Sequence, residues 1–113
     1  MHEYSIVQAM FDQIEARAHE RHAIAVKRVT VRIGAAAGVD VPLLKTAYDT
    51  FRVKTICEDA PLEVEEIPVR WVCPSGHGDI TPGRRLACGV CGSPARLAAG
   101  DEILLERLEL EVP

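Results

Sequence analysis

Apolar residues recur at helical spacing over the first part of the chain, from about Tyr4 to His22. Polar and charged residues fill the positions between them. This spacing predicts an amphipathic helix with one buried side. The residues expected on that side are Ile6, Val7, Met10, Phe11, Ile14 and Ala18.

The periodicity changes between Ala23 and Ile33. Val29, Val31 and Ile33 alternate there with polar and charged neighbours, which indicates a half-buried strand. A loop of small residues over 34–38 follows this strand.

A second helix is expected to begin after Asp40. Asp40 is a suitable N-cap, and Pro42 fits the first helical turn. We expect this helix to end near Thr55. Its apolar side would consist of Leu43, Leu44, Ala47, Tyr48 and Phe51.

Two further strands complete the expected fold. One begins with Leu62 and Val64 after the turn at Pro61, and the other covers 103–112. The alternating end of the last strand is expected to face a core through Leu108, Leu110 and Val112. The order predicts an α+β fold with a three-stranded sheet covered by two helices. Six glutamates would lie on the other side of the outer strands, where we expect a solvated sheet face: Glu63, Glu65, Glu66, Glu106, Glu109 and Glu111.

The composition shifts between Trp71 and about Leu97. This stretch holds three of the four cysteines and three of the seven prolines, and it has little helical or strand periodicity. We interpret it as a small zinc-ribbon-like module inserted before the last strand. The expected division is therefore an α+β domain of residues 1–69 and 98–113 and a zinc-binding module of residues 70–97.

The cysteine spacing indicates a metal site in this module. Cys88 and Cys91 form a C-x-x-C pair, and Cys73 lies upstream. Gly76 occupies the position where a second C-x-x-C pair would have its other cysteine, and His77 follows it. Zinc usually takes four Cys or His ligands in a tetrahedron. The best set is therefore Cys73, His77, Cys88 and Cys91, which would make a closed, structural site.

Other assignments of these residues stay open at the level of sequence. The fourth ligand could instead be water, Asp79, Cys57 or a residue of a partner chain. A redox-active C-x-x-C is a further alternative, although the pair follows a loop and does not open a helix after a strand. Cys57 is expected to be a small buried apolar residue.

Bulk properties narrow the class of protein. The 113 residues carry a net charge of −4 and only 4% are aromatic, which argues against binding nucleic acid. No stretch is apolar enough for a membrane span. No basic, apolar leader opens the chain, and closely spaced cysteines suit a reducing compartment, so we expect a cytoplasmic protein.

His2 brings several nitrogen donors together at the start of the chain. The α-amine of Met1, the imidazole of His2 and the backbone amide of His2 could bind one ion, with the amide of Glu3 as a fourth donor. Such a set suits Ni(II) or Cu(II) rather than zinc. A solvated terminal histidine is the simple alternative. For the Glu3 side chain the alternative is a favourable interaction with the helix dipole.

Several segments together resemble the HypA/HybF family of hydrogenase nickel-incorporation proteins. The opening residues 1–6 carry this resemblance, as do 31–34, 38–39, 48–51 and 60–64. It continues through the C-x-x-C segment 88–93 and ends at 100–103 and the last strand.

This resemblance implies a nickel metallochaperone and not an enzyme. Met1, His2 and Glu3 would bind nickel as transient cargo. Cys73, Cys88 and Cys91 match zinc-binding cysteines of the family, while Gly76 replaces a fourth one and His77 is the natural substitute. The expected partners are a HypB-type GTPase of the same maturation pathway and the immature hydrogenase large subunit. The chain would act as a monomer or homodimer.

Two other functions compete with this interpretation. One is a zinc-ribbon interaction adaptor that does not bind nickel, and the other is an enzyme that uses Cys57 or an open zinc site. No Ser/His/Asp or Cys/His set supports the enzyme. His19 and His22 are expected to be solvated residues near a helix end rather than ligands.

Overall fold

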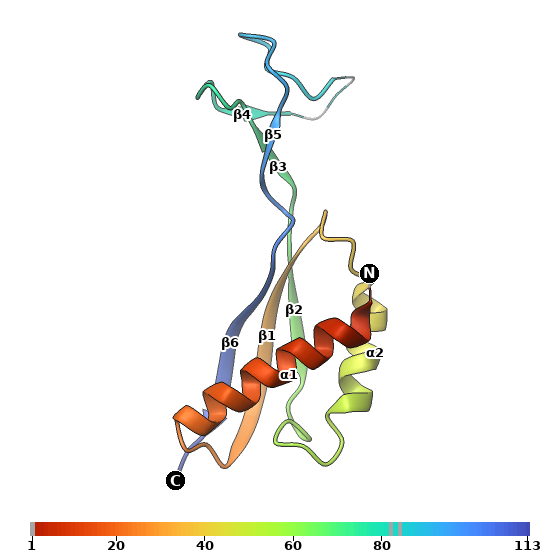
Figure 1. Cartoon of the computed structure of the whole chain (residues 1–113), viewed down its shortest axis with the longest axis vertical. Coiled ribbons are helices and arrows are strands. Elements are labelled where there is room, and N and C mark those ends of the chain that lie inside the picture. Colours follow the sequence, from red (N-terminus) through yellow and green to blue (C-terminus); the bar gives the residue numbers. More distant parts are fainter. Residues whose placement is uncertain (1, 82, 84) are drawn as a thin grey trace.

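The computed structural model describes residues 2–81, 83 and 85–113 and contains two three-stranded sheets. The molecule is elongated, 57 × 26 × 17 Å, with one sheet at each end of its long axis (Figure 1). Two helices pack only against the larger sheet. Within the described part of the chain, no helix combines the length and the apolarity that crossing a membrane requires.

The larger sheet has the strand order β2-β1-β6. Its central strand, β1 (Ala25–Gly34), pairs in parallel with β2 (Leu62–Ile67) and antiparallel with β6 (Ile103–Glu111). Helix α1 (Glu3–Glu20) precedes β1, and α2 (Val41–Phe51) connects β1 to β2. The expected order and the α+β class are confirmed.

Both helices cover the same face of this sheet (Figure 1). The Phe11 ring of α1 stacks on the Tyr48 ring of α2 at 5.6 Å between centroids. The Tyr48 hydroxyl donates a hydrogen bond of 2.8 Å to the carbonyl of Ala60, which satisfies the one polar atom of this buried ring. The helices contribute these buried apolar residues: Val7, Met10, Phe11, Ile14, Ala18, Leu44, Ala47 and Tyr48.

The opposite face of the larger sheet is charged. Arg28 of β1 lies 3.5 Å from Glu63 of β2 and 3.2 Å from Glu109 of β6. Arg32 lies 3.9 Å from Glu106 in the same way. The glutamates of the outer strands therefore flank arginines of the central strand, in partly exposed ion pairs.

Two expectations near the ends of elements are wrong. The second helix ends at Phe51 rather than near Thr55, because the chain turns there and Lys54 takes a positive φ of 61°. Val112 is 55% exposed and does not face the core, because β6 ends at Glu111. The outer positions Leu43 and Phe51 of the second helix are also exposed.

The second sheet has the order β4-β3-β5. It consists of β3 (Arg70–Val72), β4 (Asp79–Ile80) and β5 (Arg96–Ala99), all antiparallel. The sequence did not predict this sheet. Its strands have only two to four residues, which is too short to show a strand periodicity.

The two segments that join the sheets run side by side through a narrow waist (Figure 1). Gly34 ends β1 at this waist, and its amide donates to the carbonyl of Glu102 at 2.8 Å. A Cβ at Gly34 would collide with the backbone of Gly100 and Asp101. Gly100 has φ 106°, and a Cβ there would lie 2.6 Å from the Cα of Val69. Glycine is therefore required where the two segments touch the end of β1.

Gly34→Ala should lower the free energy of unfolding by about 3 kcal/mol or more, because backbone atoms cannot move aside for the new methyl group. Urea unfolding followed by circular dichroism measures this. Gly38→Ala is the matched control, since Gly38 has φ 74° but open space where the new methyl group would lie. It should cost only about 1 kcal/mol. Equal effects of the two substitutions would contradict the proposed backbone collision.

Candidate metal sites

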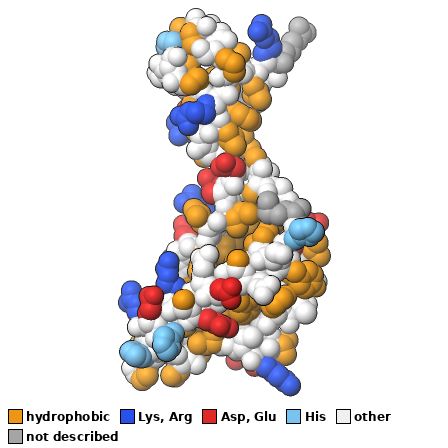
Figure 2. Space-filling model, viewed as in Figure 1, with side chains coloured by type: hydrophobic (Ala, Val, Ile, Leu, Met, Phe, Trp, Pro, Cys, Tyr) orange, Lys and Arg blue, Asp and Glu red, His pale blue; other side chains and the backbone are white. Residues whose placement is uncertain are grey.

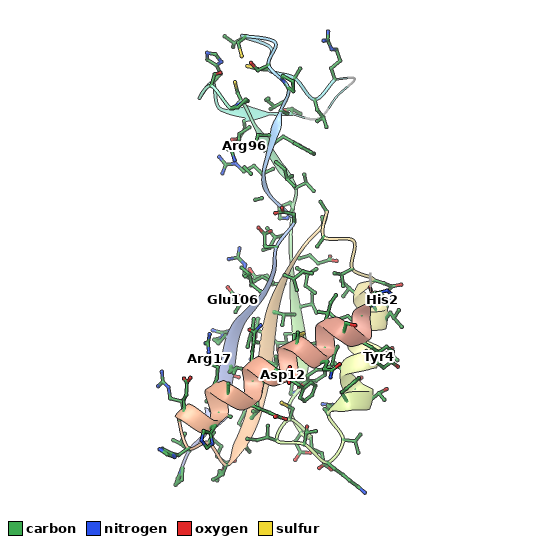
Figure 3. The ribbon with its side chains drawn as sticks, viewed as in Figure 1. His2, Tyr4, Asp12, Arg17, Arg96 and Glu106 are labelled. Carbon is green, nitrogen blue, oxygen red and sulfur yellow. The ribbon has the colours of Figure 1, made fainter. Side chains whose placement is uncertain are left out.

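Four side chains converge at the far end of the second sheet. Cys73 follows β3, His77 lies in the turn before β4, and Cys88 and Cys91 lie in the loop before β5. One potential ligand atom from each residue lies within 4.8 Å of all the others. The sulfur atoms are visible together at the top of the molecule in Figure 3.

The distances within this cluster match a tetrahedral metal site. Cys73 Sγ lies 3.4 Å from His77 Nδ1 and 3.6 Å from Cys91 Sγ. Cys88 Sγ lies 3.7 Å from His77 Nδ1. Around a tetrahedral zinc ion with its usual bond lengths, two sulfurs are about 3.8 Å apart and a sulfur and a nitrogen about 3.5 Å apart. The cluster is consistent with a structural zinc ion.

Backbone amides surround the buried sulfurs. The Ser75 amide donates to Cys73 Sγ at 3.4 Å, and the Val90 amide donates to Cys88 Sγ at 3.3 Å. Each cysteine therefore opens a tight turn whose amide lies two residues further on. Donors of this kind stabilise the thiolate, which is the form that binds a metal.

The conformation of Gly76 brings His77 to the cysteine sulfurs. Its φ is 89°, and its amide donates to the carbonyl of Cys73 at 3.1 Å. This turn brings the next residue, His77, to the sulfurs. A cysteine at position 76 would need the same positive φ, which side chains other than glycine rarely adopt.

The cluster also shifts the pKa values of Cys73, His77 and Cys91. The hydroxyl and the amide of Ser93 lower the pKa of Cys91 to about 6. The His77 backbone amide lowers the pKa of Cys73, and the Cys73 sulfur raises the pKa of the His77 imidazole. The thiolate of Cys91 is therefore favoured near neutral pH before any metal binds.

The alternative fourth ligands lie elsewhere. The Asp79 carboxylate is paired with Arg70, whose Nη2 lies 2.8 Å from Oδ1. Cys57 is buried in the core of the larger sheet, where burial raises the pKa of its thiol. The pair Cys88 and Cys91 lies in a loop and does not open a helix, which does not fit a thioredoxin-like redox site.

The beginning of α1 presents a different set of donors. Met1 lies outside the described residues. His2 is the N-cap of α1, is exposed, and makes no side-chain capping bond. The first helical hydrogen bond runs from the Ile6 amide to the His2 carbonyl at 3.2 Å. Amides before it, including that of Glu3, have no acceptor within the helix. The His2 imidazole is therefore accessible at this end (Figure 3), and the Glu3 amide, which lacks a partner in the helical backbone, faces the carboxylate of its own side chain.

The Glu3 side chain has a structural partner. It is only 6% exposed, and its Oε2 accepts a hydrogen bond of 3.0 Å from the Asp40 amide. This bond lowers the pKa of the Glu3 carboxyl, against the opposing effect of burial. Asp40 in turn caps α2 by accepting from the Leu43 amide at 3.0 Å. The carboxylate of Glu3 thus links the starts of the two helices, 37 residues apart.

Glu3→Gln should weaken this link and lower the thermal midpoint, because a neutral amide is a weaker acceptor for the Asp40 amide. Nickel stoichiometry should be unchanged if Glu3 contributes only its backbone amide. Differential scanning calorimetry and a nickel titration measure the two effects. Loss of nickel with an unchanged midpoint would instead identify the carboxylate as a ligand. Glu15→Gln on the exposed side of α1 is the control, because it removes the same charge away from the Asp40 amide.

The other histidines stand apart from both sets of donors. His19 lies in the last turn of α1 and His22 just beyond it, and both are exposed. Neither belongs to a group of metal-binding side chains among the residues that the structure describes. The sequence did not predict two contacts near these sites: the hydrogen bond from the Asp40 amide to the Glu3 carboxylate and the ion pair between Arg70 and Asp79. No local sequence signal marks either of them.

Comparison with known proteins gives consistent results over the whole chain. Residues 1–110 match a family model described as hydrogenase/urease nickel incorporation, metallochaperone, hypA. The chain is 37% identical to hydrogenase maturation factor HypA of Shewanella baltica, covering 98% of this chain and 97% of that protein. It is 38% identical to the protein of the same name from Nitrosospira multiformis, covering 97% of each.

Solved structures agree with the sequence matches. The fold is similar to the solution structure of the Ni metallochaperone HypA from Helicobacter pylori, with a TM-score of 0.75, 30% identity and full coverage of both chains. A second solution structure of a HypA protein gives a TM-score of 0.80 at 30% identity, covering 100% of this chain and 98% of that one.

Proposed function

Because this chain belongs to the HypA family of hydrogenase/urease nickel-incorporation metallochaperones, we propose that it carries Ni(II) on ligands at its N-terminus. It is a metallochaperone and not an enzyme. The proposed ligands are the amine of Met1, the imidazole and amide of His2, and the backbone amide of Glu3. The observation that carries this assignment is the exposed His2 imidazole at the start of α1, which makes no side-chain hydrogen bond within the described part of the chain.

The helix end favours the charge that such a site develops. Nickel bound to backbone amides requires them to lose a proton, which leaves negative charge on the amide nitrogens. The N-terminus of α1 stabilises negative charge, because its amide dipoles point toward it. Since the amine, imidazole and amides must all be deprotonated, nickel affinity should fall as the pH falls.

The second site is assigned to zinc held by Cys73, His77, Cys88 and Cys91. Among the described residues of 70–97, only Cys73 and Cys88 are buried. A unit with so few buried residues needs another source of stability, and a closed metal site supplies it. We therefore propose that residues 70–97 form a zinc-binding module and that residues 1–69 and 98–113 together form the nickel-binding domain.

An exposed terminal site suits metal transfer. Its ligands can be replaced one at a time by those of a recipient, without opening the core. The protein takes part in hydrogenase maturation. We propose that it works in the cytoplasm with a HypB-type GTPase, and that the recipient is the immature hydrogenase large subunit.

A transfer assay tests this function. Nickel-loaded protein is mixed with immature large subunit in the presence of a chelator that captures free nickel, and nickel on the subunit is measured by elemental analysis. The loaded protein should deliver nickel, while the same amount of free Ni(II) and a His2→Ala chain should not. Equal delivery from free nickel would contradict the proposal.

A further inference from the structure

Both outer strands of the larger sheet, β2 and β6, pair only with β1 among the described strands, and the free edge of β6 borders a groove. β6 pairs with β1 on one side only, and no described strand pairs with its other side. Its outward amides and carbonyls are therefore available to another extended segment. β6 has nine residues, so this free edge is about 30 Å long.

A groove follows this edge. It has a volume of about 770 Å³ and lies between β6 and the last turns of α1. Leu105, Leu108 and Leu110 of β6 and Val112 just beyond it supply the apolar lining. Arg17 of α1 and its C-cap residue Arg21 line the other side. Figure 3 shows Arg17 on α1 beside β6.

The charge of the groove opposes that of the whole chain. Arg17, Arg21 and Arg107 line it, although the net charge of the chain is −4. None of these three pairs with a carboxylate of the described residues, whereas Arg28 and Arg32 of the same sheet do. Figure 2 shows basic side chains at the lower left of the molecule, on the side where β6 lies.

The single acidic side chain in the lining does not neutralise these arginines. Glu106 lies 3.9 Å from Arg32 and also attracts Arg107, but it is one carboxylate against the three arginines of the lining. The groove therefore combines a free strand edge, an apolar floor and three guanidinium groups against one carboxylate side chain.

We propose that this groove binds an extended, acidic segment of a partner protein, which adds to the sheet as a strand beside β6. Main-chain hydrogen bonds to the free edge would give affinity, and the arginines would select carboxylates on the segment. This binding site involves no nickel or zinc ligand, and it lies at the opposite end of α1 from His2. It goes beyond nickel binding and does not depend on it.

The test uses the zinc-loaded full chain and a fluorescent peptide, acetyl-Thr-Glu-Val-Glu-Val-Glu-Thr-amide, followed by anisotropy. The wild-type chain should bind it, and the same peptide with lysine in place of glutamate should not bind. R17E/R21E should weaken binding by about tenfold or more. K45E/R96E is the matched control, because it makes the same charge change at exposed positions away from the groove and should bind as wild type does.

Two further measurements separate strand addition from simple charge attraction. A peptide methylated on alternate amides should lose binding if its backbone donates to β6. R17Q/R21Q, which adds no negative charge to the helix end, should also bind more weakly. His2→Ala should bind the peptide normally, so failure of the nickel assignment would leave this result intact.

Three outcomes would overturn the proposal. They are equal binding of the glutamate and lysine peptides, equal weakening by the groove and control variants, and full binding of the methylated peptide. A fourth contrary result would be a wild-type dimer in sedimentation that the R17E/R21E substitutions abolish. Such a dimer would mean that the groove binds a second copy of this chain.

Discussion

A chain with Cys88→Ser should bind no zinc at stoichiometric metal and should lose the second sheet. Cys88 is buried and belongs to the four-residue cluster, and no neighbouring side chain of the described residues replaces its sulfur. Structural zinc supplies roughly 10–16 kcal/mol of apparent binding free energy in small zinc modules. The strands around this cluster bury little else. Zinc analysis and amide hydrogen exchange would show the change.

In the Cys88→Ser chain, amide hydrogen exchange should differ between the two sheets. Amides of β3, β4 and β5 should lose protection, whereas those of β1 and α1 should keep it, because the larger sheet has its own apolar core. Cys57→Ser is the matched control. It replaces a buried sulfur in the apolar core of the larger sheet and should retain zinc and the second sheet. Burying the hydroxyl should lower the free energy of unfolding by about 1–3 kcal/mol. A Cys88→Ser chain that still holds one zinc would refute the assignment.

Acetylating the amine of Met1 should abolish tight nickel binding without changing the fold. Acetylation converts the proposed amine ligand into an amide, while the His2 imidazole stays in place. Loss of an outer-shell partner already costs about 10–100-fold in metal affinity, so loss of a ligand should cost at least about 100-fold. Competition with a chromophoric nickel chelator measures the change.

The control is the same chain extended at its C-terminus, which shows whether a modification away from the N-terminal amine affects nickel binding. It should bind nickel as the unmodified chain does, because it leaves the amine free. Zinc content and the circular dichroism spectrum should match in all three forms. Unchanged nickel affinity after acetylation would exclude the amine and leave His2 as an isolated imidazole.

Much of the fold could be predicted because local patterns and tertiary burial agree in it. Val29, Val31 and Ile33 alternate in the sequence and are buried in the structure. Asp40 caps the second helix as its residue type predicts. These features depend on neighbours in the sequence, so periodicity and capping chemistry reveal them.

What the sequence could not reveal depends on contacts between distant segments. The second sheet has strands too short to establish a period, and its strand pairing depends on the loops around the cysteine cluster. The link from Glu3 to the Asp40 amide joins a side chain to a backbone group 37 residues away. The sequence left two roles open for the carboxylate of Glu3, a nickel ligand and a contact with the helix dipole, and it gave no sign of the hydrogen bond from the Asp40 amide.

The candidate zinc ligands could be predicted in part from the sequence. Cysteine spacing pointed to Cys73, Cys88 and Cys91, but Gly76 broke the regular pattern. The structure brings His77 to the sulfurs through the positive φ of that glycine. Backbone conformation, which spacing alone does not describe, therefore connects the irregular motif to a complete set of four donors.

The most direct test of the central claim is a calorimetric titration of Ni(II) into zinc-loaded protein with an unmodified N-terminus, beside the same chain carrying His2→Ala. His19→Ala/His22→Ala serves as the control, since it removes two exposed histidines at the other end of the same helix. The wild-type and control chains should each bind about one nickel tightly, and His2→Ala should lose that binding. Equal binding by all three chains, or loss in the control alone, would contradict a nickel site at the N-terminus.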